Sequence, residues 1–354
     1  MIRFLKLTNV VGFAEFANPT AFPGITLILG KNDVCKTALL KMMYAVGKSI
    51  EQYEKQSEHN SSVFFRDVLA GKVKNVYGSL RNGLGDLVRK NGTPKKLAVY
   101  AEFDRGWASD LNFSFGVDAK KQIADFGNHE AKEKRPANYV FIPAKEVVSA
   151  FNAIKAIARQ YYFPGYDDTT LDLIDLLDIP VKRTKVDGDM SEVLNGMKEM
   201  FSGELQQVES NERFVFKRGN VEYQMPVTAE GVKHIGILPM LIMNGQIKEG
   251  TVLFLDEPED NLHPQALRQL VKILALMARR GIQVFITTHN YFMLKQMQIE
   301  ARIHQMDVLC CSLTRNDVNV VEASFANLLQ GMPDNDIVNE SLAMFDEDVS
   351  LDMK

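Results

Sequence analysis

The stretch LILGKNDVCKTALLKMMYA, residues 27–45, constrains the fold more than any other, because it joins a β-like run to an apolar-periodic helix through a single loop. The loop follows the pattern G-x-x-x-x-G-K-[ST], in which backbone N–H groups at a helix N-terminus surround phosphate oxygens. Cys35 stands where this pattern has its second glycine. The stretch therefore predicts a phosphate-binding loop with one unusual position.

Each position of the loop predicts one kind of contact to a nucleotide. Gly30 makes the turn out of the strand, Lys36 can reach the β- and γ-phosphates, and Thr37 can be a ligand of Mg²⁺. The other positions complete the predicted cofactor-binding set: Lys31, Asn32, Asp33, Val34, Cys35 and Ala38. The alternative is an ordinary strand, turn and helix in which the Lys-Thr pair arose by chance.

A second apolar run, in TVLFLDEPEDNLHP (residues 251–264), ends in two adjacent carboxylates. A buried strand that carries a carboxylate to its end can supply the second protein ligand of a Mg²⁺–triphosphate, and a neighbouring acid can polarise the attacking water. Asp256 fits the first role and Glu257 the second. The apolar strand VFITTHN then places His289 to hydrogen-bond a γ-phosphate or that water. The predicted catalytic residues are thus Glu257, His289 and Lys36, and the predicted metal ligands are Thr37 and Asp256.

Together these motifs resemble the ABC-type ATPase heads of SMC-like and RecF-like proteins and of the OLD-like ATPases of bacterial phage defence. LTNVVGFAEF is similar to the N-terminal strand of that group, GKNDVCKT to its Walker A loop, LFLDEPEDNLHP to its Walker B strand with the following D-loop, and TTHN to its switch histidine. The resemblance implies an α/β P-loop core of ABC-ATPase type with a β-rich N-terminal lobe and a large helical insertion. It also implies ATP and Mg²⁺ as cofactors, with ATP held between two heads.

In such heads a signature helix of the partner completes each nucleotide site. The segment PVTAEGVKHIG lies where this helix is expected. Glu230 and Gly231 match the common Ser-Glu-Gly form, but Ala229 replaces the serine and the hydroxyl is displaced to Thr228. Thr228, Glu230 and Gly231 are therefore candidate nucleotide contacts, although Thr228 can also be a plain helix N-cap. FIPAKE resembles a site-adjacent turn of OLD-like ATPases and adds the weaker candidates at positions 145 and 146.

Cys35 raises the question of whether the loop still works. A Cβ at the second glycine position is expected to introduce backbone strain of order 1 to 3 kcal/mol. Such strain weakens binding but removes none of the polar residues, so the sequence predicts nucleotide binding with slow hydrolysis. A cysteine at a helix N-terminus could also have a lowered pKa and act as a redox gate; the alternative is that it is simply tolerated.

The order of the motifs predicts three regions. Residues 1–45 and 226–325 form the ATPase core, residues 46–225 form an inserted lobe of strands and helices, and residues 326–354 form an acidic C-terminal helix or tail. The tail is amphipathic, so it either caps the core or docks a partner. An apolar run long enough to span a bilayer is absent from the sequence, and no membrane partner is expected.

Composition limits the class of protein. With 46% hydrophobic and 24% charged residues, the chain of 354 residues is expected to be globular, and its net charge of −4 argues against a protein that coats nucleic acid. The basic stretch at 66–96 can still be a nucleic-acid contact or a solvated face. Three cysteines give no disulfide framework and favour a reduced cytoplasm. Cys310 and Cys311 are expected on opposite faces of one strand.

These expectations combine into one hypothesis and two alternatives. The chain is expected to be a slow Mg²⁺-dependent ATPase that forms a dimer or higher homo-oligomer and regulates a separate effector protein in phage defence, a role that rests on the resemblance alone. A DNA repair or recombination head that binds duplex DNA is one alternative. A scaffold locked by ATP without hydrolysis is the other.

Overall fold

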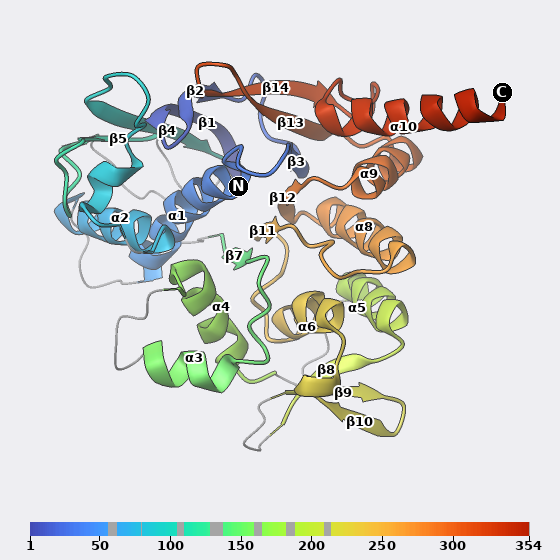
Figure 1. The fold of residues 1–354 in the computed structure, drawn as a ribbon. Coiled ribbons are helices and arrows are strands. Elements are labelled where there is room, and N and C mark those ends of the chain that lie inside the picture. Colours follow the sequence, from blue (N-terminus) through green and yellow to red (C-terminus); the bar gives the residue numbers. More distant parts are fainter. Residues whose placement is uncertain are drawn as a thin grey trace.

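The computed structural model describes residues 1–55, 62–78, 80–104, 110–127, 137–158, 165–181, 188–208 and 214–353. These residues form an α/β structure around an eleven-stranded sheet with strand order β6-β5-β4-β1-β2-β14-β13-β3-β12-β11-β7 (Figure 1). The expected α/β class with a β-rich N-terminal region is confirmed. None of the described helices is both long and apolar enough to cross a bilayer.

The parallel half of the sheet holds the predicted nucleotide motifs. Its strands are β3 (Ile25–Leu29), β7 (Tyr139–Ile142), β11 (Val252–Asp256), β12 (Gln283–Thr288) and β13 (Val308–Arg315). Because these strands are parallel, their carboxyl ends lie at the same edge of the sheet, which is where ligands bind in open α/β folds. The loop after β3, the two carboxylates at the end of β11 and the histidine after β12 are thereby brought to one edge.

The other half of the sheet is mostly antiparallel. It consists of β1 (Ile2–Val10), β2 (Phe13–Ala17), β4 (Lys96–Phe103), β5 (Leu111–Gly116), β6 (Asp125–Phe126) and β14 (Val321–Asn327). β14 pairs with β13 and touches β2 at one residue pair, so it joins the two halves. The N-terminal strands therefore continue the sheet that carries the nucleotide motifs.

Helices cover both faces of the sheet, and the alternation of each strand decides which residues meet which helices. α1 (Lys36–Lys55) and α2 (Ser62–Val76) pack on one face, and α8 (Pro264–Arg279) and α9 (Tyr291–His304) pack on the other. Ile28 belongs to the core under α1, whereas Leu27 and Leu29 belong to the opposite core. Cys310 and Cys311 divide in the same way, as predicted from a period of two.

The region predicted as an insertion, 46–225, has two different parts. Its strands β4 to β7 pair within the main sheet. The remaining elements are α3 (Phe151–Ala158), α4 (Asp168–Asp178), α5 (Gly188–Phe201) and a separate three-stranded sheet of β8 (Glu204–Gln207), β9 (Phe214–Arg218) and β10 (Val221–Gln224). We propose that only this second part, from α3 to β10, is the inserted lobe. Two short helices, α6 (Glu230–Ile235) and α7 (Leu238–Met243), then lead back to β11.

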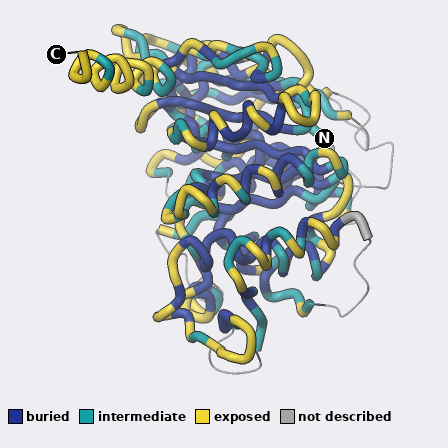
Figure 2. The backbone as a smooth tube through the Cα atoms, turned by 90° about the vertical axis from the view of Figure 1, so that its right-hand side faces the viewer, coloured by how far each residue is buried: buried dark blue, intermediate teal, exposed yellow. Residues whose placement is uncertain are grey.

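The acidic tail forms the helix α10 (Asp336–Asp352), as its sequence predicted. The side chain of Asn335 caps it by accepting a hydrogen bond from the backbone N–H of Val338. Ile337 and Val338 are half-buried against the core, but no residue of the helix is buried. The interpretation of α10 as a helix that caps the core is therefore wrong, and Figure 2 shows it leaving the body as an exposed rod.

Candidate nucleotide site

The loop from Gly30 to Cys35 turns the chain from β3 into α1. Gly30 has a φ of 151°, and a Cβ there would lie 2.6 Å from the carbonyl oxygen of Leu313 on the neighbouring strand. Both the backbone conformation and the close strand require glycine at this position. The first glycine of the motif is thus explained by the fold itself.

Lys36 is the first residue of α1, and its ammonium group is turned back into the loop. Nζ donates hydrogen bonds to the carbonyl oxygens of Gly30 at 2.9 Å and Lys31 at 3.0 Å, and it lies 3.3 Å from Oε1 of Glu257. The side chain is only 6% exposed. The cation is therefore held at the mouth of the loop, where phosphate oxygens can replace its present acceptors.

Thr37 and Asp256 form a pair of hard oxygen ligands. The hydroxyl of Thr37 donates to both carboxylate oxygens of Asp256, at 2.9 and 3.1 Å, and the hydroxyl of Thr287 donates to Oδ1 at 2.6 Å. Burial raises the pKa of Asp256, and these two hydroxyls oppose the shift. A hydroxyl and a carboxylate suit Mg²⁺, which takes one or two protein ligands and completes its shell with phosphates and water.

Glu257 follows Asp256 in an uncommon backbone conformation with a φ of 47°. Its backbone N–H lies 3.2 Å from the carbonyl oxygen and 3.0 Å from the hydroxyl of Thr287, and donates to both. Nδ1 of His289 lies 3.3 Å from Oε1 of Glu257, the same oxygen that faces Lys36. The structure thus brings together the three residues predicted to be catalytic. Thr287, which the sequence did not single out, fixes the position of both acids.

Glu259 is a further buried acid that the sequence did not single out. Thr288 donates a hydrogen bond to its Oε1, while Oε2 is buried without a hydrogen-bond partner. The same Thr288 hydroxyl accepts the backbone N–H of Asn290. Glu259 therefore ties the loop after β11 to the turn that carries His289. Burial raises the pKa of Glu259 to about 7.

This pKa predicts a pH dependence of stability. Between the ordinary value of 4.5 and the folded value near 7, the folded chain binds more protons than the unfolded chain, so stability falls as pH rises. Glu259→Gln should remove this contribution and reduce the loss of unfolding free energy between pH 5 and pH 8 by about 2 kcal/mol. Urea titrations at several pH values measure it, with the exposed Glu15→Gln as control. Equal slopes for wild type and Glu259→Gln would show that Glu259 ionises normally.

Cys35 adopts a φ of 63°, the left-handed conformation that the motif normally assigns to glycine. Its thiol fills the space beside Gly12, where an added Cβ would lie 2.7 Å from Sγ. Burial raises the pKa of the thiol, and the guanidinium of Arg315, 4.0 Å from Sγ, offsets this only in part. This direction is opposite to the lowered pKa that the alternative of a redox gate requires, and gives that alternative no support. The strain expected from the sequence does have a structural basis.

The predicted signature segment forms the short helix α6. Glu230 and Gly231 begin it, and Gly231 packs so close to the carbonyl oxygen of Asn261 that a Cβ would lie 2.7 Å away. Ala229 is the N-cap, without a side-chain hydrogen bond. The hydroxyl of Thr228 donates instead to the carbonyl oxygen of Gln224 at 2.9 Å. The interpretation of Thr228 as the N-cap is wrong.

The FIPAKE turn contacts the same helix through a residue that the sequence did not single out. His234, on α6, places Nε2 2.8 Å from the carbonyl oxygen of Pro143. Lys145 is exposed in this turn, and the carboxylate of Glu146 accepts the backbone N–H of Ser149. The turn thus supports α6 through its backbone, and neither charged side chain is seen to join the catalytic residues.

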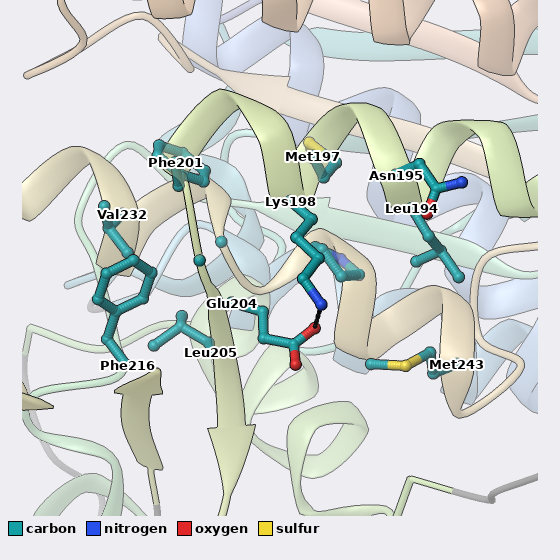
Figure 3. Close-up of a pocket in the computed structure, with 13 residues that line it drawn as sticks. Leu194, Asn195, Met197, Lys198, Phe201, Glu204, Leu205, Phe216, Val232 and Met243 are labelled. Carbon is teal, nitrogen blue, oxygen red and sulfur yellow. Dashed lines mark ion pairs between the residues drawn. The ribbon is translucent and has the colours of Figure 1, made fainter. Parts of the chain in front are cut away.

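An apolar hollow is lined on one side by α6 (Figure 3). It has a volume of about 170 Å³ and lies between α5, β8, β9 and the helices α6 and α7. Val232 and Phe216 line its wall, and Lys198 lies 3.8 Å from Glu204 across it. A cavity of about this size holds one small apolar group, not a nucleotide. No residue of the phosphate loop lines it.

Three lysines of the basic stretch 66–96 pair with carboxylates of the chain. Lys72 is buried and pairs with Asp168 at 2.6 Å. Lys90 pairs with Asp86 at 3.2 Å, and Lys96 pairs with Asp125. Ammonium groups that are already paired contribute less to phosphate binding. The structure thus gives little support to a DNA contact at these three lysines.

The α/β core, the phosphate loop and the adjacent carboxylates define the class of P-loop ATP-binding domains. The chain belongs to the family described as "AAA domain, putative AbiEii toxin, Type IV TA system", whose model matches residues 88–295. This range includes the carboxylates after β11 and the histidine after β12, but begins after the phosphate loop. No curated protein matches the chain.

Solved structures show the same fold at low sequence identity. An SMC head bound to the C-terminal winged-helix domain of ScpA matches with a TM-score of 0.55 at 12% identity, covering 93% of this chain and 98% of the other. The SMC head domain from Thermotoga maritima matches with a TM-score of 0.50 at 12% identity, covering 92% and 98%. The expected ABC-type head fold is therefore confirmed.

Proposed function

We propose that this chain binds ATP with Mg²⁺ and hydrolyses it slowly. The observation that carries the proposal is the hydroxyl of Thr37, which donates to both carboxylate oxygens of Asp256 at the edge where Lys36, Glu257 and His289 also meet. Transfer of a phosphoryl group to water requires oxygen ligands for the metal, a cation near the phosphates, and groups that orient and deprotonate the water. This site brings such residues together.

Each residue has a role in this proposal. The loop backbone from Gly30 to Ala38 surrounds the phosphates, and Lys36 neutralises the β- and γ-phosphates. Thr37 and Asp256 hold Mg²⁺, which neutralises phosphate charge when bound. Glu257 accepts a proton from the attacking water, and His289 orients that water or the γ-phosphate.

The assembly that we propose is a head-to-tail dimer with ATP between two copies. In it, Thr228, Glu230 and Gly231 of one copy approach the γ-phosphate bound by the other, since a helix N-terminus favours an anion. The ABC-type head fold supports this arrangement. Gly231, the second residue of α6, packs on the loop after β11, so the proposed signature helix contacts the segment that follows the two acids.

In the cell, we propose that the chain regulates a separate effector in defence against phage. One solved relative is an SMC head bound to a domain of another protein, ScpA, so a head of this fold can act through a second chain. The family description names a toxin of a toxin–antitoxin system, which also supports a role alongside other proteins. The assignment to defence rests on the resemblance of the motifs.

A non-hydrolysing scaffold locked by ATP is the second candidate. Two observations favour it: the positive φ of Cys35, and the contact between Lys36 and Glu257, which neutralises the proposed base. The DNA repair head is the weaker alternative, because the described lysines at 72, 90 and 96 pair with carboxylates of this chain.

Cys35→Gly tests both whether the site binds ATP and whether the cysteine slows hydrolysis. Glycine adopts a φ of 63° without the strain of about 1 to 3 kcal/mol that a Cβ adds, so the variant should bind ATP about 5- to 150-fold more tightly and turn it over faster. ATP binding and phosphate release are measured on the purified chain with Mg²⁺ and with EDTA. Cys35→Ala is the control, because it removes the thiol but keeps the Cβ. If neither wild type nor Cys35→Gly binds ATP, the proposed function fails.

A further inference from the structure

α10 exposes an amount of apolar surface that is unusual for a helix of its length. It has 17 residues and no buried one. The side chains of Leu342, Met344, Phe345 and Leu351 are each more than half exposed. Exposed apolar residues are unremarkable when scattered, but a continuous set on one element marks an interaction surface.

The apolar residues of α10 follow a helical repeat. Val338, Leu342, Phe345 and Val349 are spaced by four, three and four residues, so they share one face of the helix. The stripe starts at the half-buried Val338 and continues onto the free part of the helix. Carboxylates flank it, at Asp346 on one side and at Asp348 and Asp352 on the other. We call these residues the acidic stripe of α10.

α9 presents a complementary surface. Phe292, Ile299 and Ile303 are exposed, and their spacing of seven and four residues places them on one face. Lys295 and Arg302 are exposed beside them. Between residues 292 and 304, every exposed residue of this helix is apolar, basic or histidine. We call this set the basic stripe of α9.

We propose that the acidic stripe of α10 packs on the basic stripe of α9 in a second copy of this chain. In both stripes the apolar residues recur at helical spacing along the centre, and the charges along the edges of the two stripes are opposite. Such complementarity selects one partner over others. A contact between two α10 helices would bring carboxylates against carboxylates, so α10 is not expected to pair with itself.

The arrangement of the two helices allows the contact to be reciprocal. α9 and α10 contact each other in one copy. The first turn of α10 packs on the body, and the rest of the helix projects beyond it (Figures 1 and 2). In the proposed dimer, a two-fold axis would place each α10 on the α9 of the other copy and bury two equivalent contacts. This dimer goes beyond the proposed ATP-bound dimer and needs no nucleotide.

The base of α10 lies close to the phosphate loop. Asp336, its first residue, lies 3.1 Å from Nζ of Lys31, and Asn335 donates to the hydroxyl of Ser312 on β13. β13 pairs directly with β3, the strand that enters the loop. The α9–α10 contact would thus hold α10 next to the phosphate loop, although no residue of either stripe is among those proposed to bind ATP.

Sedimentation velocity of the full chain without nucleotide tests the contact. Wild type should form a dimer, and Phe345→Asp should weaken it by at least about thirtyfold, because it replaces a central aromatic residue by a like charge. Val221→Asp, at an exposed valine on β10, is the matched control and should dimerise as wild type does. Far-UV circular dichroism checks that each variant is folded.

A charge exchange between copies makes the test specific. One variant carries Lys295→Glu with Arg302→Glu, and the other carries Asp348→Lys with Asp352→Lys. Each alone has like charges at both contacts and should be monomeric, whereas an equimolar mixture has opposite charges at both contacts and should form dimers again. Restoration on mixing is specific to contacts between the two stripes of different copies.

Three results would overturn the proposal. Wild type could be monomeric at concentrations up to about 100 µM, Phe345→Asp could dimerise as wild type does, or the mixture of charge-exchanged variants could fail to form dimers. If wild type is monomeric and Phe345→Asp loses a different protein partner, α10 docks that partner instead. Because these measurements contain no ATP, failure of the proposed ATPase activity would leave their outcome unaffected.

Discussion

Glu257→Gln should lower ATP turnover by about 10²- to 10³-fold and leave ATP binding within a few-fold of wild type. The side chain of Glu257 is 22% exposed, and its backbone is held by Thr287, so an amide of the same shape fits without rearrangement. The amide cannot accept a proton from water at neutral pH. It also leaves the ammonium of Lys36 without its carboxylate partner, which favours phosphate as the new acceptor.

Phosphate release and fluorescent-nucleotide binding measure the two effects separately. Glu249→Gln, an exposed carboxylate in the loop before β11, is the control and should behave as wild type. Unchanged turnover in Glu257→Gln would place water activation elsewhere. If turnover is lost while assembly and cellular output persist, hydrolysis is not needed for function, and ATP acts as the ligand that locks the scaffold.

Local patterns predicted those parts of the fold that a short segment determines. β3 and β11 are fully buried strands, and their mainly apolar sequences predict them. The loop after β3 and the pair of acids at the end of β11 follow motifs with a fixed order of residues, so their place at one edge of the sheet could be predicted from the sequence. α10 was predicted as a helix for the same reason, since its period of apolar residues is local.

Pairing between distant strands was not predictable in this way. β4 and β5 alternate like ordinary strands, and nothing in their sequence says that they extend the main sheet through β1. We therefore propose an inserted lobe that is smaller than the one predicted from the sequence. Whether α10 covers the core or leaves it was also undecided, because an amphipathic helix fits either environment.

Which residues contact the buried acids could not be predicted, because the main contact depends on the register of two strands. Asp256 is paired with Thr287 across β11 and β12, so the hydroxyl reaches the carboxylate only in that register. Thr288, the next residue of β12, donates instead to Glu259 in the turn after β11. A single sequence contains no signal for such pairs. Cys35 differs, since the motif itself predicted a position that disfavours a Cβ and the φ of 63° agrees.

Lys36→Ala should weaken ATP binding by at least about 100-fold, because it removes two charge-assisted contacts to phosphates of about 1.5 kcal/mol each. The binding free energy that is lost is smaller than the full strength of those contacts. In the free protein the ammonium already contacts the carbonyl oxygens of Gly30 and Lys31 and the carboxylate of Glu257. The same buried partners lose their cation in the variant, so its unfolding temperature should also fall.

Lys31→Ala is the matched control for this prediction. Lys31 belongs to the same loop, but its side chain is 72% exposed and pairs with Asp336 instead of pointing into the loop. Its removal should change ATP binding only a few-fold, because an exposed charge in water contributes little. Equilibrium titration with ATP and Mg²⁺ compares the two variants. Equal, small effects would show that the loop does not hold phosphate through Lys36, whereas a loss confined to Lys36→Ala would assign the phosphate contact to the buried ammonium.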